Sequence, residues 1–264
     1  MFTLNQSLYV KGAAGNPLPK VWETLEARFL RGQLALICAG PGVGKSAFIL
    51  TYALKSKIPT LYFSADSDSF TQLSRALSIT TGTELSTTNR MVRKGDLGDT
   101  DFTDTPIRFN YNASPTLNEI EMSMESYMEV YGDYPALVVV DNITNVITGS
   151  KENADDPFAG LEAMMDVLHK FGRDSGACIV GLHHVNSGYN DSNRIVPMSG
   201  VKGQVGRVPE LILTMHRLNE QFGPDTLCVS TVKNRAGKAD PSGCDYISLD
   251  FTGDTMQIVD RKQV

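Results

Sequence analysis

Short apolar runs alternate with longer amphipathic segments along most of the chain. Runs with the length and the residue types of buried strands lie at residues 33–38, 60–64, 136–141, 177–182 and 211–215. Apolar residues at helical spacing predict helices over residues 21–30, 47–54 and 70–79, and Thr116 and Glu119 form a capping box that begins another. This alternation predicts an α/β fold with a mainly parallel central sheet flanked by helices.

Three parts of the chain depart from the alternation. Residues 1–20 form a mixed arm whose closing prolines argue against regular structure, and residues 82–105 have the polar composition of a surface excursion. From Thr226 onward the pattern changes to β-hairpins, with a turn at residues 252–254. We therefore expect an N-terminal arm over residues 1–20 and one domain over residues 21–264 that ends in antiparallel strands.

The composition narrows the class of protein. Of the 264 residues, 41% are hydrophobic and 20% are charged, which suits a globular protein with a buried core. No apolar run is long enough to span a membrane, and the first residues lack the pattern of a signal peptide. The net charge of −6 excludes a polycation that coats nucleic acid, so any nucleic-acid contact must be local or shared among subunits. The four cysteines lack metal-ligand spacing, and we expect free thiols in a reducing cytoplasm.

A glycine-rich segment follows the first apolar run directly. It reads Ala39-Gly40-Pro41-Gly42-Val43-Gly44-Lys45-Ser46, and Ala47 continues into the next predicted helix. This strand–loop–helix order matches a phosphate-binding loop in every position but the first, where Ala39 replaces Gly. The glycines allow backbone N–H groups to surround a polyphosphate, and the helix N-terminus adds partial positive charge. We expect all nine residues to bind ATP, with Lys45 on the β- and γ-phosphates and Ser46 on Mg²⁺. The alternative is a structural turn.

Two acidic residues follow other apolar runs. The carboxyl ends of parallel strands share one ligand crevice, which puts Asp141 beside Ser46 and predicts that it binds Mg²⁺ through water. Asp66 follows the run at residues 60–64, where a carboxylate can orient and deprotonate an attacking water. Asp68 is the neighbouring alternative for that base. The simpler interpretations are a turn or N-cap acid at Asp141 and a solvated loop acid at Asp66.

A histidine pair ends the run at residues 177–182. His183 and His184 are expected at the same edge of the sheet, where a polar side chain can sense the γ-phosphate and pass its state to the following loop. The alternative is a partly buried pair with local hydrogen bonds. No other His, Cys or acidic residue lies at metal-ligand spacing from the pair.

Together these segments resemble a known family. The phosphate loop, then Phe63-Ser64-Ala65-Asp66, then Val138-Val139-Val140-Asp141 resemble the RecA-like ATPase core of DnaB-type hexameric replicative helicases. The resemblance covers residues 15–260 and implies a RecA-like P-loop NTPase fold that uses ATP and Mg²⁺. Asp66 stands where that family has a catalytic Glu, which is one methylene longer.

The resemblance extends to two later elements. The pair at residues 183–184 is similar to the family's sensor position, which implies a sensor role for His184. Lys233-Asn234-Arg235-Ala236-Gly237 resembles the family's late Lys-x-Arg-x-Gly element. By that resemblance, Lys233 and Arg235 reach across a subunit boundary to the neighbour's γ-phosphate.

The segment between residues 185 and 208 is the candidate DNA-binding loop. It carries Arg194, Lys202 and Arg207, and a few cations per subunit, repeated around a ring, can form an electrostatic track for a single strand. The alternative is a flexible, solvated loop that binds nothing. Residues 145–155, with Lys151, are a weaker second candidate.

Three functions compete. The first is an ATP-hydrolysing ring motor on single-stranded DNA, a helicase or translocase in phage-type replication. The second is a recombination or repair ATPase that binds DNA without unwinding it, with or without nuclease activity. The third is a regulatory ATPase of the KaiC type. The first implies a stand-alone core like those of phage or plasmid relatives, a homo-oligomeric hexameric ring, primase or other replication proteins as partners, and the host cytoplasm as location.

Overall fold

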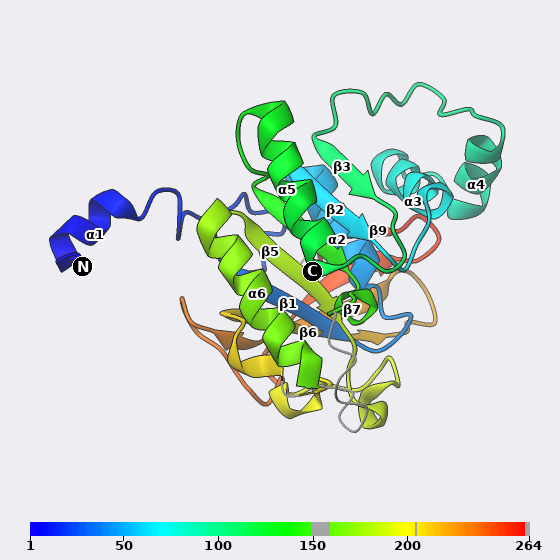
Figure 1. The fold of residues 1–264 in the computed structure, drawn as a ribbon. Coiled ribbons are helices and arrows are strands. Elements are labelled where there is room, and N and C mark those ends of the chain that lie inside the picture. Colours follow the sequence, from blue (N-terminus) through cyan, green and yellow to red (C-terminus); the bar gives the residue numbers. More distant parts are fainter. Residues whose placement is uncertain (149–158, 204, 262–264) are drawn as a thin grey trace.

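The computed structural model describes residues 1–148, 159–203 and 205–261. A nine-stranded sheet in the order β3-β2-β4-β5-β1-β6-β7-β8-β9 forms its centre (Figure 1). The strands are β1 (Leu34–Ala39), β2 (Thr60–Ser64), β3 (Ile107–Asn110), β4 (Leu137–Asp141), β5 (Cys178–His183), β6 (Leu211–Leu218), β7 (Asp225–Asn234), β8 (Tyr246–Thr252) and β9 (Gln257–Asp260). The α-helices are α1 (Leu4–Val10), α2 (Lys45–Ser56), α3 (Ser69–Thr81), α4 (Leu85–Arg93), α5 (Leu117–Tyr131) and α6 (Ala159–Ser175).

The sheet joins a parallel part to an antiparallel part. Strands β3, β2, β4, β5, β1 and β6 run parallel, whereas β7, β8 and β9 continue the sheet as antiparallel hairpins. The predicted α/β fold class is therefore confirmed, including its antiparallel C-terminal strands. We call the end of the sheet where β1, β4 and β5 finish the carboxyl edge, and the end where β1 and β6 begin the amino edge.

Two apolar layers cover the sheet. Alternate β1 residues point to opposite faces, as the pleat requires. Ala35 and Ile37 join the layer that contains Phe48 of α2, whereas Leu34 and Leu36 join the layer under α5 and α6. Figure 1 shows α5 and α6 lying side by side over the sheet. Because both faces are covered, the central strands are apolar throughout, which is the pattern the sequence displays.

The helix predicted over residues 21–30 is wrong. Trp22 and Phe29 are buried as expected, and the Trp22 ring stacks on Phe48 with centroids 4.3 Å apart. The backbone is irregular, however, because its N–H groups bond elsewhere. The N–H groups of Glu23 and Thr24 donate to the Asp260 carboxylate of β9, at 2.8 and 3.0 Å. Tertiary hydrogen bonds thus override a helical spacing of apolar residues.

Two helices lie where the sequence predicted irregular structure. The polar excursion at residues 82–105 contains α4, and the arm at residues 1–20 contains α1. Thr3 caps α1 in a capping box with Gln6, yet none of the residues of α1 is buried. Figure 1 shows α1 standing away from the body of the protein. No helix among the described residues is both long and apolar enough for a membrane span.

Candidate functional site

The glycine-rich loop connects β1 to α2 at the carboxyl edge, as predicted. Gly44 has a φ of 121°, which side-chain-bearing residues rarely adopt, and it caps α2 without a side-chain hydrogen bond. The Lys45 ammonium donates to the carbonyl oxygens of Ala39 (3.0 Å) and Gly40 (3.1 Å). Burial lowers the pKa of Lys45, while the nearby charges of Asp141 and Asp66 raise it. A cation at an uncapped helix N-terminus makes this loop suited to an anion.

Asp141 ends β4 beside the loop, as the parallel sheet predicts. Its Oδ2 accepts a hydrogen bond of 2.9 Å from the Tyr62 hydroxyl. The residue is almost fully buried, and burial raises the pKa of the Asp141 carboxyl against the lowering effect of the neighbouring Ser46 and Tyr62 hydroxyls. A serine hydroxyl and a carboxylate in contact are the oxygen donors that Mg²⁺ accepts in nucleotide sites.

Asp66 and Asp68 differ in their contacts. The Asp66 backbone N–H donates to the Asp141 carbonyl (3.1 Å), and its carboxylate accepts from Asn145 Nδ2 at 3.4 Å. Asp68 instead caps α3, because its carboxylate accepts the Thr71 N–H at 2.8 Å. The structure therefore gives Asp68 a local role and leaves Asp66 beside Asp141.

The His184 ring is hydrogen-bonded to the side chain of Asn142, the residue after Asp141. The Asn142 side-chain oxygen accepts the Thr144 N–H at 2.9 Å, so its Nδ2 faces His184 Nε2, also at 2.9 Å. Because an amide nitrogen only donates, His184 Nε2 is the acceptor. Burial and the charge of Lys45 lower the pKa of His184, which keeps the ring neutral. His184 is thus connected to the residue that follows Asp141.

His183 connects the sheet to the candidate DNA-binding loop. Its Nε2 lies 2.6 Å from the Lys202 carbonyl and must donate to it, while Nδ1 is buried without a partner. Burial lowers the pKa of His183 to about 4. The loop is also fixed by a bridge between Val185 and Val201 and by the Asn186 N–H on the Gly200 carbonyl at 2.8 Å. These contacts disagree with a flexible, solvated loop.

The same loop packs on the phosphate loop. A Cβ atom at Gly40 would lie 2.9 Å from the Asn190 carbonyl oxygen and 3.3 Å from that of Tyr189. Only glycine permits this approach of two backbones. The Arg217 N–H then ties the loop to β6 by donating to the Ser192 carbonyl at 2.6 Å. Because the two backbones are in contact at Gly40, neither loop can move toward the other without displacing it.

The three cations predicted to bind DNA do not form one patch. Arg194 and Lys202 lie on the part of the loop anchored at the carboxyl edge, where the Lys202 N–H donates to the His184 carbonyl at 3.2 Å. Arg207 lies before β6, at the amino edge, and forms ion pairs with Glu162 and Asp166 of α6. Its charge is thus balanced by two carboxylates. The second candidate loop, with Lys151, falls largely outside the described residues.

Lys233 and Arg235 also lie at the amino edge. Asn234 pairs with Leu211 and Leu211 with Ala35, whereas the phosphate loop follows Ala39, four residues further along β1. At about 3.3 Å per residue, the two sites are at least about 13 Å apart along the strands. The Lys233 ammonium donates to the carbonyls of Gly206 (2.6 Å) and Arg207 (2.9 Å). Arg235 is exposed and donates one bond of 3.1 Å to the Arg207 carbonyl.

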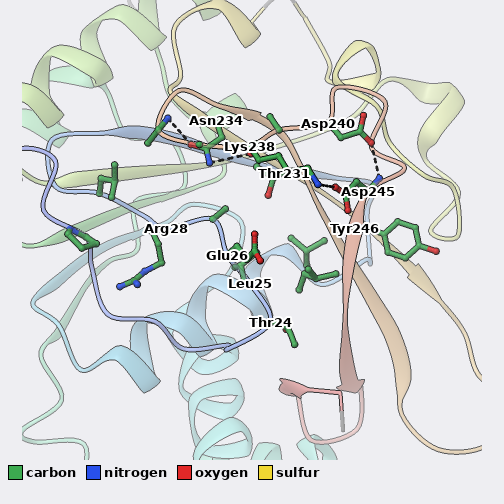
Figure 2. Close-up of a pocket in the computed structure, with 18 of the residues that line it drawn as sticks. Thr24, Leu25, Glu26, Arg28, Thr231, Asn234, Lys238, Asp240, Asp245 and Tyr246 are labelled. Carbon is green, nitrogen blue, oxygen red and sulfur yellow. Dashed lines mark hydrogen bonds and ion pairs between the residues drawn. The ribbon is translucent and has the colours of Figure 1, made fainter. Parts of the chain in front are cut away.

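A cavity of about 700 Å³ lies between residues 15–30 and the β7–β8 hairpin, apart from the phosphate loop (Figure 2). Figure 2 shows Glu26 and Arg28 on one side, with Lys238 and Asp245 on the hairpin side. Lys238 and Asp245 form an ion pair of 2.7 Å, so these charges balance each other. The cavity therefore lacks a cluster of unbalanced cations for phosphate groups, and the phosphate loop remains the candidate nucleotide site.

Sequence reasoning missed three residues of the site, Tyr62, Asn142 and Asn190. The signal for Tyr62 was present, because a tyrosine in a fully buried strand needs a partner for its hydroxyl. Asn142 directly follows Asp141 and could have been included by adjacency. Asn190 acts through its backbone carbonyl, for which the sequence carries no signal.

Two curated relatives come from mycobacteriophages. The Gene 65 protein of Mycobacterium phage L5 is 60% identical over 98% of this chain and 99% of its own length. The Gene 65 protein of Mycobacterium phage D29 is 59% identical over 86% of this chain and 99% of its own length. Both names give a gene number and no activity. The family model described as "AAA domain" matches residues 9–188.

Solved structures of the same fold include replication and recombination proteins. A DnaB-like replicative helicase described with its primase interactions superposes with a TM-score of 0.78 at 15% identity, over 98% of this chain and 67% of that one. The ATPase domain of G40P gives 0.77 at 15% identity, over 98% and 96%. The RadB recombinase gives 0.59 at 18% identity, over 89% and 93%. The chain belongs to the AAA domain family and has the RecA-like fold of DnaB-type helicase ATPase domains.

Proposed function

We propose that this protein is an ATP-hydrolysing ring motor on single-stranded DNA, a helicase or translocase in phage-type DNA replication. The observation that carries the proposal is the separation of two sets of cations. Lys45 serves the phosphate loop at the carboxyl edge, whereas Arg235 is exposed at the amino edge, at least about 13 Å away. Arg235 cannot serve its own nucleotide, and a second copy of the chain supplies a nucleotide that it can reach.

The described residues suit Mg²⁺ and ATP. Ser46 and Asp141 would hold the metal, and Lys45 would exchange the carbonyls of Ala39 and Gly40 for phosphate oxygens. The metal, when bound, neutralises negative charge on the phosphates. Asp66 would orient the attacking water and take its proton as the bond from the γ-phosphorus to ADP breaks.

The DNA strand would contact Arg194 and Lys202. His183 bonds to the Lys202 carbonyl, and Asn190 packs on Gly40, so the loop has two direct contacts with elements of the nucleotide site. Arg207 is left out, because Glu162 and Asp166 already balance its charge. The variant with both Arg194→Ala and Lys202→Ala should bind single-stranded DNA more weakly, and its log–log salt slope should fall by about 0.7 per lost phosphate contact. Arg207→Ala is the matched control and should keep the parent slope.

A homo-oligomeric ring, hexameric as in the family that the chain resembles, is part of the proposal. Helix α1 supports it: its residues Leu4, Leu8 and Tyr9 are between 63% and 92% exposed. Isolated helices of this length are unstable in water, so contact with a neighbouring copy would stabilise α1. Primase or another replication protein is proposed as a further partner, because one structure of the same fold is described with primase.

One set of measurements tests the function. ATP hydrolysis should rise when single-stranded DNA is added, the mass in solution should be that of a ring with nucleotide bound, and a forked duplex should be unwound. The recombinase alternative, favoured by the likeness to RadB, predicts DNA stimulation without unwinding. The KaiC-type alternative predicts no DNA stimulation, with autophosphorylation. An ATPase indifferent to DNA would therefore contradict the leading proposal.

A further inference from the structure

One buried hydroxyl at the site has no role in the function proposed so far. Tyr62 lies in β2, its side chain is fully buried, and its hydroxyl donates to Asp141 Oδ2 at 2.9 Å. A tyrosine hydroxyl that faces a carboxylate donates to it, so Asp141 Oδ2 is the acceptor of this bond. Asp141 is 1% exposed, so protein groups rather than solvent surround its carboxylate.

The sheet sets the geometry of this contact. Tyr62 pairs with Val139 across the β2–β4 ladder, and Asp141 lies two residues beyond Val139. Residues two apart on a strand share one face, so the Tyr62 and Asp141 side chains meet diagonally on the same face. The Tyr62 ring packs on Phe109 of β3, with centroids 5.2 Å apart. Rigid strands and a ring contact therefore hold the hydroxyl in place.

We propose that Tyr62 is a positioning residue for the magnesium site, an inference that rests on the proposed nucleotide-binding function. By holding Oδ2 from the core side, the Tyr62 hydroxyl fixes the rotation of the Asp141 carboxylate. The carboxylate then keeps its orientation toward Ser46, the residue at the first turn of α2. Hydrogen-bond partners of metal-binding carboxylates orient them in this way, and their removal typically weakens metal affinity by about 10–100-fold.

The test is Tyr62→Phe, which removes the hydroxyl and keeps the ring. The affinity for a fluorescent ADP analogue is measured with saturating Mg²⁺ and with excess EDTA, together with the Mg²⁺ concentration that gives half of the gain. The affinity gained from Mg²⁺ should fall about tenfold, with the EDTA affinity unchanged. Tyr52→Phe is the matched control, because the Tyr52 hydroxyl donates an equally long bond of 2.9 Å to the Pro19 carbonyl, away from the site.

The outcomes separate the two proposals. Parent-like Mg²⁺ dependence in Tyr62→Phe would overturn the positioning role, as would an equal loss in Tyr52→Phe. In an Asp141→Asn background, Tyr62→Phe should cause no further loss of the Mg²⁺-dependent affinity, since the residue acts through Asp141. A further loss of similar size would also contradict the proposal. If the parent protein bound the nucleotide without any effect of Mg²⁺, the proposed site itself would fail, and the role of Tyr62 would fail with it.

Discussion

The two ends of the sheet carry cations that are used differently. At the carboxyl edge, the Lys45 ammonium bonds to carbonyls of its own loop, and the Tyr62 hydroxyl bonds to the Asp141 carboxylate. At the amino edge, the Lys233 ammonium donates to the carbonyls of Gly206 and Arg207, and the exposed Arg235 side chain donates one bond to the Arg207 carbonyl. The carboxyl edge holds the candidate nucleotide site of the chain. The amino edge presents the guanidinium of Arg235, which lies too far from that site to contact a nucleotide bound to its own chain.

This difference indicates how two residues of one short motif divide their tasks. Burial, and then the nearby charge of Arg235, lower the pKa of Lys233, and its ammonium donates to two backbone carbonyls. Lys233 therefore has a structural task, and Arg235 is the better candidate for a contact between copies. The sequence-based prediction assigned both residues to the neighbour's γ-phosphate, with Arg235 as the arginine finger.

Arg235→Ala tests the proposed role of the amino edge in ATP hydrolysis and has the largest expected effect. Turnover should fall by about 10³–10⁵-fold in the assembled protein, the range for arginine residues that stabilise transferring phosphoryl groups in trans. Steady-state ATP hydrolysis measures the change, with nucleotide affinity recorded alongside. Lys238→Ala is the control, since Lys238 is a nearby cation already paired with Asp245. Parent-like turnover in Arg235→Ala would remove the amino edge from the reaction.

Lys45→Ala tests the role of the phosphate loop at the carboxyl edge. Loss of the cation that stabilises the β- and γ-phosphates should cost about 10²–10³-fold in turnover. Lys55→Ala, in the last turn of the same helix, should keep parent activity, because Lys55 bonds to the Ile258 carbonyl far from the loop. An active Lys45→Ala protein would move the nucleotide site elsewhere.

Asp66→Asn sharpens the description of the carboxyl edge. Turnover should fall by about 10²-fold as the base is lost, while nucleotide affinity is retained. Asp68→Asn should change turnover little, because asparagine caps helices as well as aspartate does. Measuring affinity and kcat for both variants decides between them. A larger loss of turnover in Asp68→Asn than in Asp66→Asn would instead identify Asp68 as the base.

The pH dependence of stability tests whether His183 is buried as a neutral ring against the candidate DNA-binding loop. The pKa of His183 is lowered from 6.5 to about 4 by burial, so its contribution is complete above pH 6.5 and is lost as the pH falls toward about 4. The full effect is at most about 3 kcal/mol of unfolding free energy. Chemical denaturation of the parent and of His183→Gln should give a smaller loss for the variant across that range. Parallel curves would mean that His183 is not buried as a neutral ring.

The sequence predicts the centre of the molecule better than its periphery. Strands β1, β2, β4 and β5 are apolar throughout because helices cover both faces, and the glycine-rich loop has a fixed pattern, so these elements were predicted. The irregular segment at residues 21–30 was not, because Asp260, more than 200 residues away, accepts N–H groups of Glu23 and Thr24. The residues of the site differ in the same way. The place of Asp141 could be predicted because it directly ends an apolar strand. The buried Tyr62 hydroxyl could be expected to need a partner, but that the partner is Asp141 depends on the register of β2 and β4, which one sequence does not reveal.

The central claim is that Arg235 acts on a neighbouring copy, and a mixing experiment tests it most directly. Lys45→Ala and Arg235→Ala proteins should each be nearly inactive alone. After subunit exchange, some interfaces pair an intact phosphate loop with an intact Arg235, so part of the ATP hydrolysis should return, with a maximum near equal amounts of the two proteins. Mixtures that stay inactive at every ratio, despite demonstrated exchange of subunits, would contradict the claim.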